Sequence, residues 1–341
     1  MLPVPKDYEP MEATLTSELP RGEGWQYEPK WDGFRCLAFK EGKDIQLQSK
    51  SGRELGRYFP EIIEYLQNLD APCFVLDSEI VVPSGNEFSF DDLLQRIHPA
   101  ASRIKKLARE TPAVMIVFDI LTDERNESLV MEPLSSRRVN LEKFAAKYLT
   151  GNLNVVLSPA TTNATVTDDW LAKMGNRLDG IVAKRLDLPY QSGNRKGMQK
   201  VKKLRTADCV VGGFRYATGT KKAIGSLLLG LHDEKGLLNH VGFSSSFTAK
   251  ERVQLVEKLE PLIAKPGFTG DAPGGPSRWS TERSTEWEPL KNTLIAEVTY
   301  DHFTNGRFRH GTRFVRWRPD KAPEQCTYEQ IHGYRAPSVK S

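Results

Sequence analysis

The pattern of apolar and polar positions predicts a mixture of strands and helices over residues 1–205. Short apolar or alternating runs bounded by Gly, Pro, Asn or Asp predict strands at 36–39, 45–49, 73–82 and 113–121. Apolar residues at helical spacing predict helices over 59–69, 135–149 and 165–176. Because these elements lack the regular strand–helix alternation of a doubly wound fold, the pattern predicts an α+β domain with antiparallel sheets.

The second part of the chain, from about Thr206, has a different pattern. Short apolar runs predict strands at 208–216, 226–232, 237–245, 294–301 and 312–318. One helix is predicted over 247–263, and a loop rich in Pro and Gly follows at 265–276. Several short strands with a single helix are typical of a small β-barrel, for which the OB-fold is one candidate. We therefore predict two domains, 1–205 and 206–341.

The composition is that of a globular protein, with 27% charged and 39% hydrophobic residues in 341. No stretch approaches the roughly 18 apolar residues of a membrane span, and the first residues lack the apolar region of a secretory signal, so we expect no membrane partner. The four cysteines have no C-x-x-C spacing, which argues against a zinc site or a disulfide scaffold and favours a reducing cytosol.

The basic residues are concentrated in two runs, although the net charge is only +4. Nine Lys and Arg lie between Arg195 and Lys222 with one acid, Asp208, and a second run extends from Arg307 to Lys321. Such runs suit a polyanionic partner, but charge alone fits a pair of solvated faces equally well.

One lysine stands in a motif that suggests chemistry. Lys30 lies in the stretch EPKWDGFR, between a proline and a tryptophan and ahead of an Asp-Gly pair and Arg35. A lysine becomes a nucleophile only when burial or neighbouring cations lower its pKa. The Asp-Gly pair allows a tight turn, and Arg35 or the basic stretch near Lys200 can supply the cations. An ordinary surface lysine is the alternative at this point.

The stretch resembles the first signature of the covalent nucleotidyltransferases, which include ATP-dependent DNA ligases, RNA ligases and mRNA capping enzymes. Six further signatures of that superfamily follow in order. They are QSKSGREL from Gln48, VLDSEIVV with Asp77 and Glu79, VFDIL from Val117, LDGIVAK from Leu178, QKVK from Gln199 and RPDK from Arg318. The resemblance extends from about Tyr27 to Lys321, and seven ordered signatures do not arise by chance.

The resemblance implies a role for each matching residue. Lys30 attacks the α-phosphate of ATP and becomes a lysyl-AMP adduct. The positions implied at the α-phosphate, where fixed positive charge stabilises the transition state, are Lys184, Lys200 and Lys202. The other nucleotide-binding positions are Glu28, Arg35, Lys50, Glu79, Phe118 and Val182, with Arg318, Asp320 and Lys321 orienting the pyrophosphate from the second domain. Asp32 orients the amine or holds a metal, and Asp179 and Glu79 match positions for Mg²⁺ or Mn²⁺.

Two of these positions depart from the pattern. The family's glutamate is Asp179 here, and its second-signature arginine is Lys50, which lacks the planar fork. Met198 and Gln199 stand where many ligases have Trp and Leu. Taken without the other signatures, Phe118 would be interpreted as a core residue.

Among the superfamily, the chain most resembles the small two-domain bacterial ATP-dependent ligases of the mycobacterial C class. NAD-dependent ligases are longer and carry a four-cysteine zinc site. The resemblance implies a monomer of the bacterial cytosol, used at the nucleoid, which seals 3′-hydroxyl/5′-phosphate nicks in duplex DNA during repair. The alternatives are a capping-type guanylyltransferase that uses GTP and a nucleic-acid-binding protein whose active site has decayed.

Overall fold

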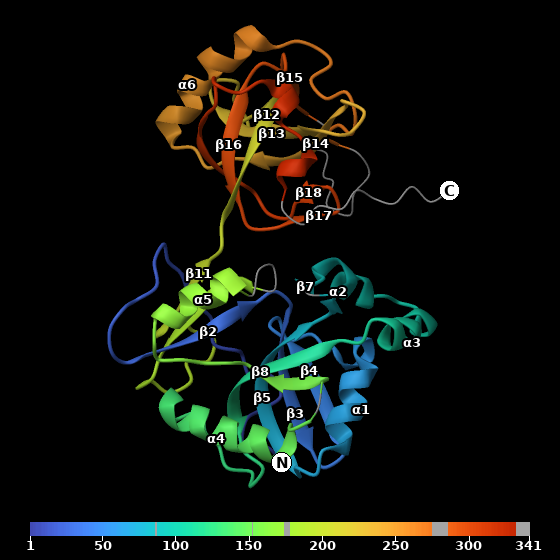
Figure 1. The fold of residues 1–341 in the computed structure, drawn as a ribbon, viewed down its shortest axis with the longest axis vertical. Helices are drawn as coiled ribbons and strands as arrows, with labels where there is room; N and C mark the ends of the chain where they lie inside the picture. The colour runs from blue at the N-terminus through green and yellow to red at the C-terminus, as the bar shows by residue number, and fades with distance from the viewer. Residues whose placement is uncertain (86, 152, 174–177, 275–285, 332–341) are drawn as a thin grey trace. The chain divides into compact units, whose positions relative to one another are not determined.

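The computed structural model describes residues 1–85, 87–151, 153–173, 178–274 and 286–331 (Figure 1). The chain divides into two compact units, Met1–Lys203 and Leu204–Ser341. The predicted break at 205/206 falls at the start of β12, the first strand of the second unit. In the described part of the chain, no helix is long and apolar enough to cross a membrane.

The first unit contains a five-stranded sheet covered by helices on one face. Its order is β4 (Asp44–Ser49), β3 (Phe34–Glu41), β5 (Cys73–Val81), β8 (Val114–Thr122) and β9 (Val155–Leu157). The pairs are antiparallel except β8–β9. Leu76 and Val117 of the sheet share a core with Ile62 of α1 (Pro60–Asn68) and Phe144 of α4 (Leu134–Tyr148). The antiparallel α+β prediction for this unit is confirmed.

A second, four-stranded sheet of the same unit carries most of the predicted site. Its order is β1 (Thr14–Leu15), β11 (Met198–Lys202), β10 (Leu178–Arg185) and β2 (Trp25–Trp31). β1 runs parallel to β11, and the other pairs are antiparallel. One face of β2 and β10 forms an apolar cluster in which Tyr27 and Ile181 are buried, with Trp170 of α5 (Thr165–Lys173) against them. The opposite face is polar.

The remaining elements of the first unit are short. They are β6 (Pro83–Ser84), β7 (Glu87–Phe88), α2 (Phe90–Arg96), α3 (Ala101–Glu110) and a 3₁₀ turn at Gly56–Tyr58. Sequence analysis predicted neither α2 nor α3. Arg96, at the end of α2, is fully buried and donates to both carboxylate oxygens of Glu61 at 2.7 and 2.9 Å, so this connection is fixed to α1.

In the described part of the second unit, a six-stranded sheet and the helix α6 enclose a separate core. The sheet order is β14 (Leu238–Ser244), β13 (Ile224–His232), β12 (Arg205–Tyr216), β16 (Ile295–Tyr300) and β19 (Arg313–Trp317), with β15 (Glu288–Pro289) beside β12. Smaller elements are α6 (Ala249–Leu259), the hairpin β17 (Phe303–Thr304) and β18 (Arg307–Phe308), and 3₁₀ turns at Glu260–Leu262, Pro323–Gln325 and Tyr328–Gln330. This is the β-rich domain with one main helix that the sequence predicted.

The sheet of the second unit does not close into a continuous barrel within the described residues. Its edge strands β14 and β19 do not form a regular ladder, and an isolated parallel bridge joins Ser244 to Thr312, the residue before β19. A partly open sheet of short strands of this kind is compatible with the predicted OB architecture. The β-barrel that the sequence predicted is thus an open sheet within these residues.

The other predicted elements agree with the structure to within a few residues. The strands at 36–39, 45–49 and 113–121 lie within or at the ends of β3, β4 and β8, and the helix over 135–149 is α4. Residues 174–176 of the helix predicted over 165–176, and 275–276 of the predicted loop, lie outside the described residues.

Candidate active site

The register of three adjacent strands brings the predicted lysines onto one face. Strands β2, β10 and β11 align three rows of residues. The rows are Gln26–Lys184–Met198, Glu28–Val182–Lys200 and Lys30–Gly180–Lys202. Because strand side chains alternate between faces with period two, rows two residues apart share a face. We call this side, with Lys30, Lys184, Lys200 and Lys202, the lysine face.

Gly180 makes the close packing of this face possible. It lies opposite both Lys30 and Lys202, at a β-bulge, with φ +150°. A Cβ atom at this position would lie 1.9 Å from the carbonyl oxygen of Val201. Only glycine fits there, which explains the glycine in the LDGIVAK signature.

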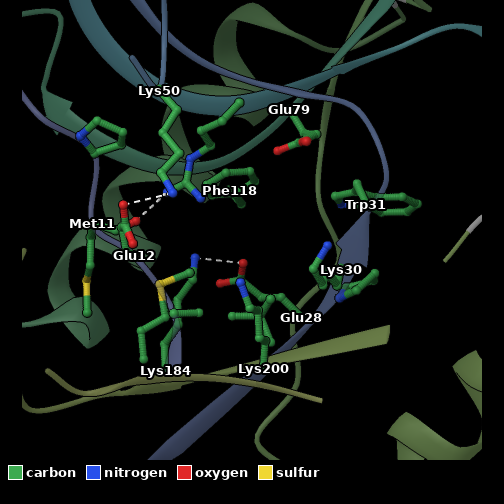
Figure 2. Close-up of a pocket in the computed structure, with 16 residues that line it drawn as sticks. Met11, Glu12, Glu28, Lys30, Trp31, Lys50, Glu79, Phe118, Lys184 and Lys200 are labelled. Atoms are coloured by element: carbon green, nitrogen blue, oxygen red, sulfur yellow. Dashed lines mark hydrogen bonds and ion pairs between the residues drawn. The ribbon is translucent and has the colours of Figure 1, made fainter. Parts of the chain in front are cut away.

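A pocket of ≈ 170 Å³ opens over the lysine face (Figure 2). The predicted residues that line it are Glu28, Lys30, Arg35, Lys50, Glu79, Phe118, Val182, Lys184 and Lys200. Asp32 and Lys202 are not among its lining residues, although Lys202 lies on the same face. Sequence analysis missed one wall, the segment 10–13, because an irregular N-terminal stretch carries no periodic signal.

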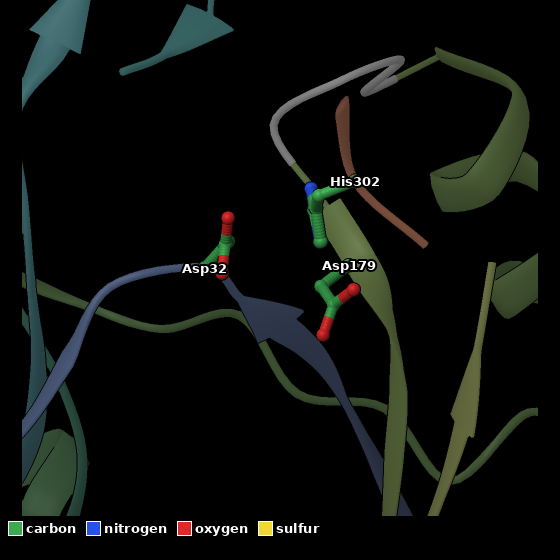
Figure 3. A group of neighbouring side chains, drawn as sticks. All are labelled: Asp32, Asp179 and His302. Atoms are coloured by element: carbon green, nitrogen blue, oxygen red, sulfur yellow. The ribbon is translucent and has the colours of Figure 1, made fainter. Parts of the chain in front are cut away.

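Lys30 lies in the pocket beside an acidic pair. Its Nζ forms a salt bridge with Asp179, which is only 4% exposed. Carboxylate oxygens of Asp32 and Asp179 lie within 4.8 Å of each other (Figure 3). Two carboxylates at this separation match the oxygen ligands that Mg²⁺ prefers. The shorter side chain of Asp179 therefore still reaches the amine that the motif predicts as nucleophile.

Glu28 and Lys184, which both line the pocket, form a buried ion pair. The Lys184 Nζ lies 2.8 Å from Glu28 Oε2, and Gln26 Nε2 donates to Glu28 Oε1 at 2.7 Å. Both charged side chains are buried, with exposed fractions of 6% for Lys184 and 3% for Glu28. Lys184 Nζ also lies 4.6 Å from the centroid of the Phe118 ring. Both carboxylate oxygens of Glu28 thus have partners within the protein.

Arg35 is held across Phe118 by a buried carboxylate. Its Nε and Nη2 each donate to one oxygen of Asp77 at 2.6 Å, a bidentate geometry that fixes the guanidinium plane. The Arg35 Cζ lies 4.6 Å from the centre of the Phe118 ring. The predicted ribose-binding arginine and base-stacking ring are therefore in contact with each other.

The charges in the pocket favour the binding of a phosphate group together with a cation. Burial, together with Lys30 and Lys202, lowers the pKa of Lys200. Burial also raises the pKa of Glu79 to about 7, against the opposing effect of Arg35 and Lys30. The backbone N–H of Gly33 donates to Glu79 Oε1 at 3.1 Å. Phosphate binding would relieve the repulsion among the lysines, and a cation would favour ionised Glu79.

Lys50 lines the pocket from its more exposed side. Its Nζ lies 2.8 Å from Glu12, and Arg195 contacts the same carboxylate at 2.9 Å. Hydrogen bonds from Lys50 and Arg195 lower the pKa of Glu12. The position predicted from the second signature is thus at the pocket, with an acidic partner from the N-terminal wall that sequence analysis missed.

The last signature lies in the second unit and forms its own charged group. Arg318 Nη1 donates to both oxygens of Asp208 at 2.9 and 3.0 Å, and its Nη2 lies 2.9 Å from Asp320. Lys321 Nζ donates to Asp208 at 2.6 Å, and Glu297 lies 3.8 Å from Arg318. The hydrogen bond from Arg318 lowers the pKa of Asp320 to about 2. We call these five residues the Arg318 cluster.

Comparisons with known proteins cover nearly the whole chain. The family described as "ATP dependent DNA ligase domain" matches residues 9–202, and "ATP dependent DNA ligase C terminal region" matches 220–321. DNA ligase C1 of Mycolicibacterium smegmatis is 43% identical, over 97% of this chain and 95% of the relative. DNA ligase C of Mycobacterium tuberculosis is 37% identical over the same shares. A solved Lig E DNA ligase has a TM-score of 0.57 at 16% identity, covering 91% of this chain and 99% of that chain, which is a likeness of fold.

Proposed function

The chain belongs to the ATP-dependent DNA ligase family, and from this premise we propose that it seals 3′-hydroxyl/5′-phosphate nicks in duplex DNA through a lysyl-AMP intermediate at Lys30. The observation that carries the proposal is the alignment of Lys30, Lys200 and Lys202 on one sheet face, beside a pocket. Family membership assigns ATP as the nucleotide and nicked DNA as the substrate class, which disfavours the GTP-using capping alternative.

In the first step, Lys30 Nζ attacks the α-phosphorus of ATP. A nitrogen–phosphorus bond forms as the bond to pyrophosphate breaks, and the amine gives up its proton, with Asp179 as the carboxylate in contact with it. Lys200 and Lys202 supply fixed positive charge where negative charge develops. A divalent cation held by Asp32 and Asp179 would neutralise phosphate charge.

The same residues suggest how the nucleotide is held. Phe118 and Val182 provide apolar surface for the base, and Glu79 and Arg35 lie beside them at the pocket wall. Arg35 Nε and Nη2 are engaged by Asp77 and by the Met11 carbonyl, so a contact of Arg35 with the ribose would use Nη1.

We propose two roles for residues of the second unit, one in the first step and one in binding DNA. Arg318 and Lys321 orient the pyrophosphate during the first step, and the basic runs help to bind the duplex through its phosphates. The AMP then passes to the 5′-phosphate, and the 3′-hydroxyl displaces it to seal the strand. We also propose that the protein acts as a monomer in the bacterial cytosol, which light scattering with and without DNA would test for the oligomeric state.

The direct test uses ATP labelled at the α-phosphate, with Mg²⁺ or Mn²⁺, a denaturing gel and a chase with nicked DNA. We expect a labelled band that requires Lys30 and disappears as the nick is sealed. GTP is run in parallel. Labelling by GTP in place of ATP would move the proposal to capping chemistry, and a folded protein that binds DNA but takes no label would be a decayed, binding-only member.

A further inference from the structure

The loop between β10 and β11 places a buried tyrosine behind the pocket. Tyr190 is 6% exposed, and its hydroxyl donates to Asp77 Oδ2 at 2.6 Å and accepts from the backbone N–H of Met11 at 2.9 Å. The guanidinium of Arg137 lies 5.5 Å from the centre of its ring. Burial raises the pKa of Tyr190 well above its ordinary value, which favours the protonated hydroxyl.

Both partners of the Tyr190 hydroxyl are attached to the pocket. Asp77 is the carboxylate that holds Arg35 across Phe118. Met11 is part of the pocket wall, and its carbonyl accepts from Arg35 Nη2 at 3.3 Å. The two backbone polar groups of Met11 are therefore held by two residues that both contact Asp77. We call Met11, Arg35, Asp77, Phe118 and Tyr190 the Tyr190 network.

The same loop holds the N-terminal segment through further contacts, besides that of Arg195 with Glu12. The backbone N–H of Glu12 donates to the carbonyl of Asn194 at 2.9 Å, and the hydroxyl of Ser192 donates to the carbonyl of Glu9 at 2.8 Å. The wall is thus kept in place by a loop distant in sequence. The Tyr190 hydroxyl also binds Asp77, which holds the pocket-lining Arg35.

We propose that Tyr190 is a positioning residue for ATP: its hydroxyl fixes the Met11 backbone as a pocket wall and fixes Asp77, which in turn directs Arg35 across Phe118. The inference rests on the proposed function, because it takes this pocket as the ATP site. Tyr190 does not line the pocket, so its effect passes through the residues that do.

The energetic argument concerns the hydroxyl alone. Replacement by phenylalanine keeps the ring and its packing against Arg137, but leaves the Met11 N–H without its acceptor and Asp77 with one donor fewer. A buried donor that loses its partner is unfavourable, and the wall can relieve this cost by moving. Movement of the wall and of Arg35 changes the shape of the nucleotide pocket, so the loss should be seen in ATP affinity.

The test measures ATP binding in a Lys30→Ala parent, which cannot form the covalent adduct, by calorimetric titration. We expect Tyr190→Phe to raise the Kd for ATP about tenfold, corresponding to about 1.4 kcal/mol. The matched control is Tyr27→Phe, which also removes a buried hydroxyl from this unit, one that donates to the carbonyl of Pro20 at 2.7 Å. We expect this control to change the Kd less than about twofold, with a similar fall in Tm.

A double-mutant cycle separates positioning from a general loss of stability. If Tyr190 acts through Asp77, Tyr190→Phe should weaken ATP binding much less when Asp77→Asn is already present, because the shared network has been broken. A Kd for Tyr190→Phe equal to that of Tyr27→Phe, or full additivity with Asp77→Asn, would overturn the inference and leave the proposed function intact. A parent protein that binds no ATP would overturn both.

Discussion

The lysine face of the first unit and the Arg318 cluster of the second differ in how their positive charge is balanced. On the lysine face, Lys200 has Lys30 and Lys202 as neighbours that lower its pKa, and no carboxylate among the described residues forms a salt bridge with it. In the Arg318 cluster, both Arg318 and Lys321 contact Asp208, and Asp320 binds Arg318 as well.

This difference indicates which of the two sets of residues can bind a phosphate without exchanging its present salt-bridge partners. Like charges held together on a rigid sheet raise the energy of the empty site, and an anion relieves that repulsion. A guanidinium already bound to two carboxylates gains little from a phosphate unless those contacts are exchanged. Lys200 on the lysine face can therefore receive a phosphate directly, whereas Arg318 must first exchange the carboxylate contacts that it already makes.

The largest effect is expected at Lys30 and would test whether the lysine face contains a nucleophile or only charge. Lys30→Arg keeps a cation beside Asp179, but an arginine stays protonated and cannot attack phosphorus. We expect no labelled adduct with ATP, whereas Lys43→Ala, which removes an exposed lysine of the same unit, should label normally. Adduct formation by Lys30→Arg would assign the nucleophile to another residue.

The next effect concerns the cations on the lysine face. Lys30 and Lys202 repel the charged amine of Lys200 and lower its pKa. Lys200→Ala removes this repulsion, but it also removes a positive charge that would stabilise the transition state. We expect the rate of adenylylation to fall about 10²-fold, the loss typical of one electrostatic contact in an active site. Lys196→Ala, an exposed residue of the same basic run, is the control in rapid-quench measurements. A loss in ATP Kd alone would make Lys200 a binding residue only.

A third prediction uses the raised pKa of Glu79. Its pKa of about 7 in the folded protein exceeds the ordinary 4.5, so the folded state holds the proton more tightly than the unfolded state. Stability should therefore fall as pH rises from about 4.5 through 7, and Glu79→Gln should remove this fall. At pH 8 without ligand we expect the variant to be more stable by roughly 2 kcal/mol, since part of the shift is screened by solvent.

Urea unfolding at pH 4 and pH 8 checks the Glu79 prediction. The gap between the two proteins should close at pH 4, where the carboxyl is protonated in both states. The amide introduced by Glu79→Gln keeps an oxygen that can accept from the Gly33 N–H, so the substitution is nearly isosteric. A gap of equal size at both pH values would attribute the effect to packing.

Much of the lysine face could be predicted from sequence because its residues lie in short motifs. The spacing Glu28–Lys30 and Lys200–Lys202 fits a strand with one polar face, and the signatures marked it. The strands themselves were not predicted, since buried charged residues such as Lys184 interrupt the apolar pattern on which strand prediction depends.

The contacts that complete the Tyr190 network and the Arg318 cluster are long-range, and no local pattern contains them. Met11 and Tyr190 are 179 residues apart, and Asp208 and Arg318 are 110 apart. Asp208 was counted as the single acid of a basic run, but β12 places it against the last signature, two strands away in the sheet. The balance of charge in the Arg318 cluster therefore depends on topology, which composition cannot supply.

The smallest effect is expected at Asp208, and it tests whether the carboxylates of the Arg318 cluster compete with the pyrophosphate. Asp208→Asn keeps the shape of the side chain and its backbone bonds to Gln330, but removes the charge that holds Arg318 and Lys321. If that contact competes with the pyrophosphate, adenylylation should become about threefold faster, a gain of about 0.7 kcal/mol. Sealing of a nick already carrying AMP, which involves no pyrophosphate, should keep its rate.

Glu297→Gln is the matched control for Asp208→Asn, because Glu297 lies farther from Arg318, at 3.8 Å, and is already bound to Arg316. It should change adenylylation less than Asp208→Asn does. A slower first step in Asp208→Asn, at an unchanged Tm, would mean that Asp208 aligns Arg318 and Lys321 for their ligand. In that case Asp208 would both neutralise Arg318 and Lys321 and orient them for the pyrophosphate. The Arg318 cluster would then differ from the lysine face in needing an exchange of partners before it binds a phosphate, and not in its ability to bind one.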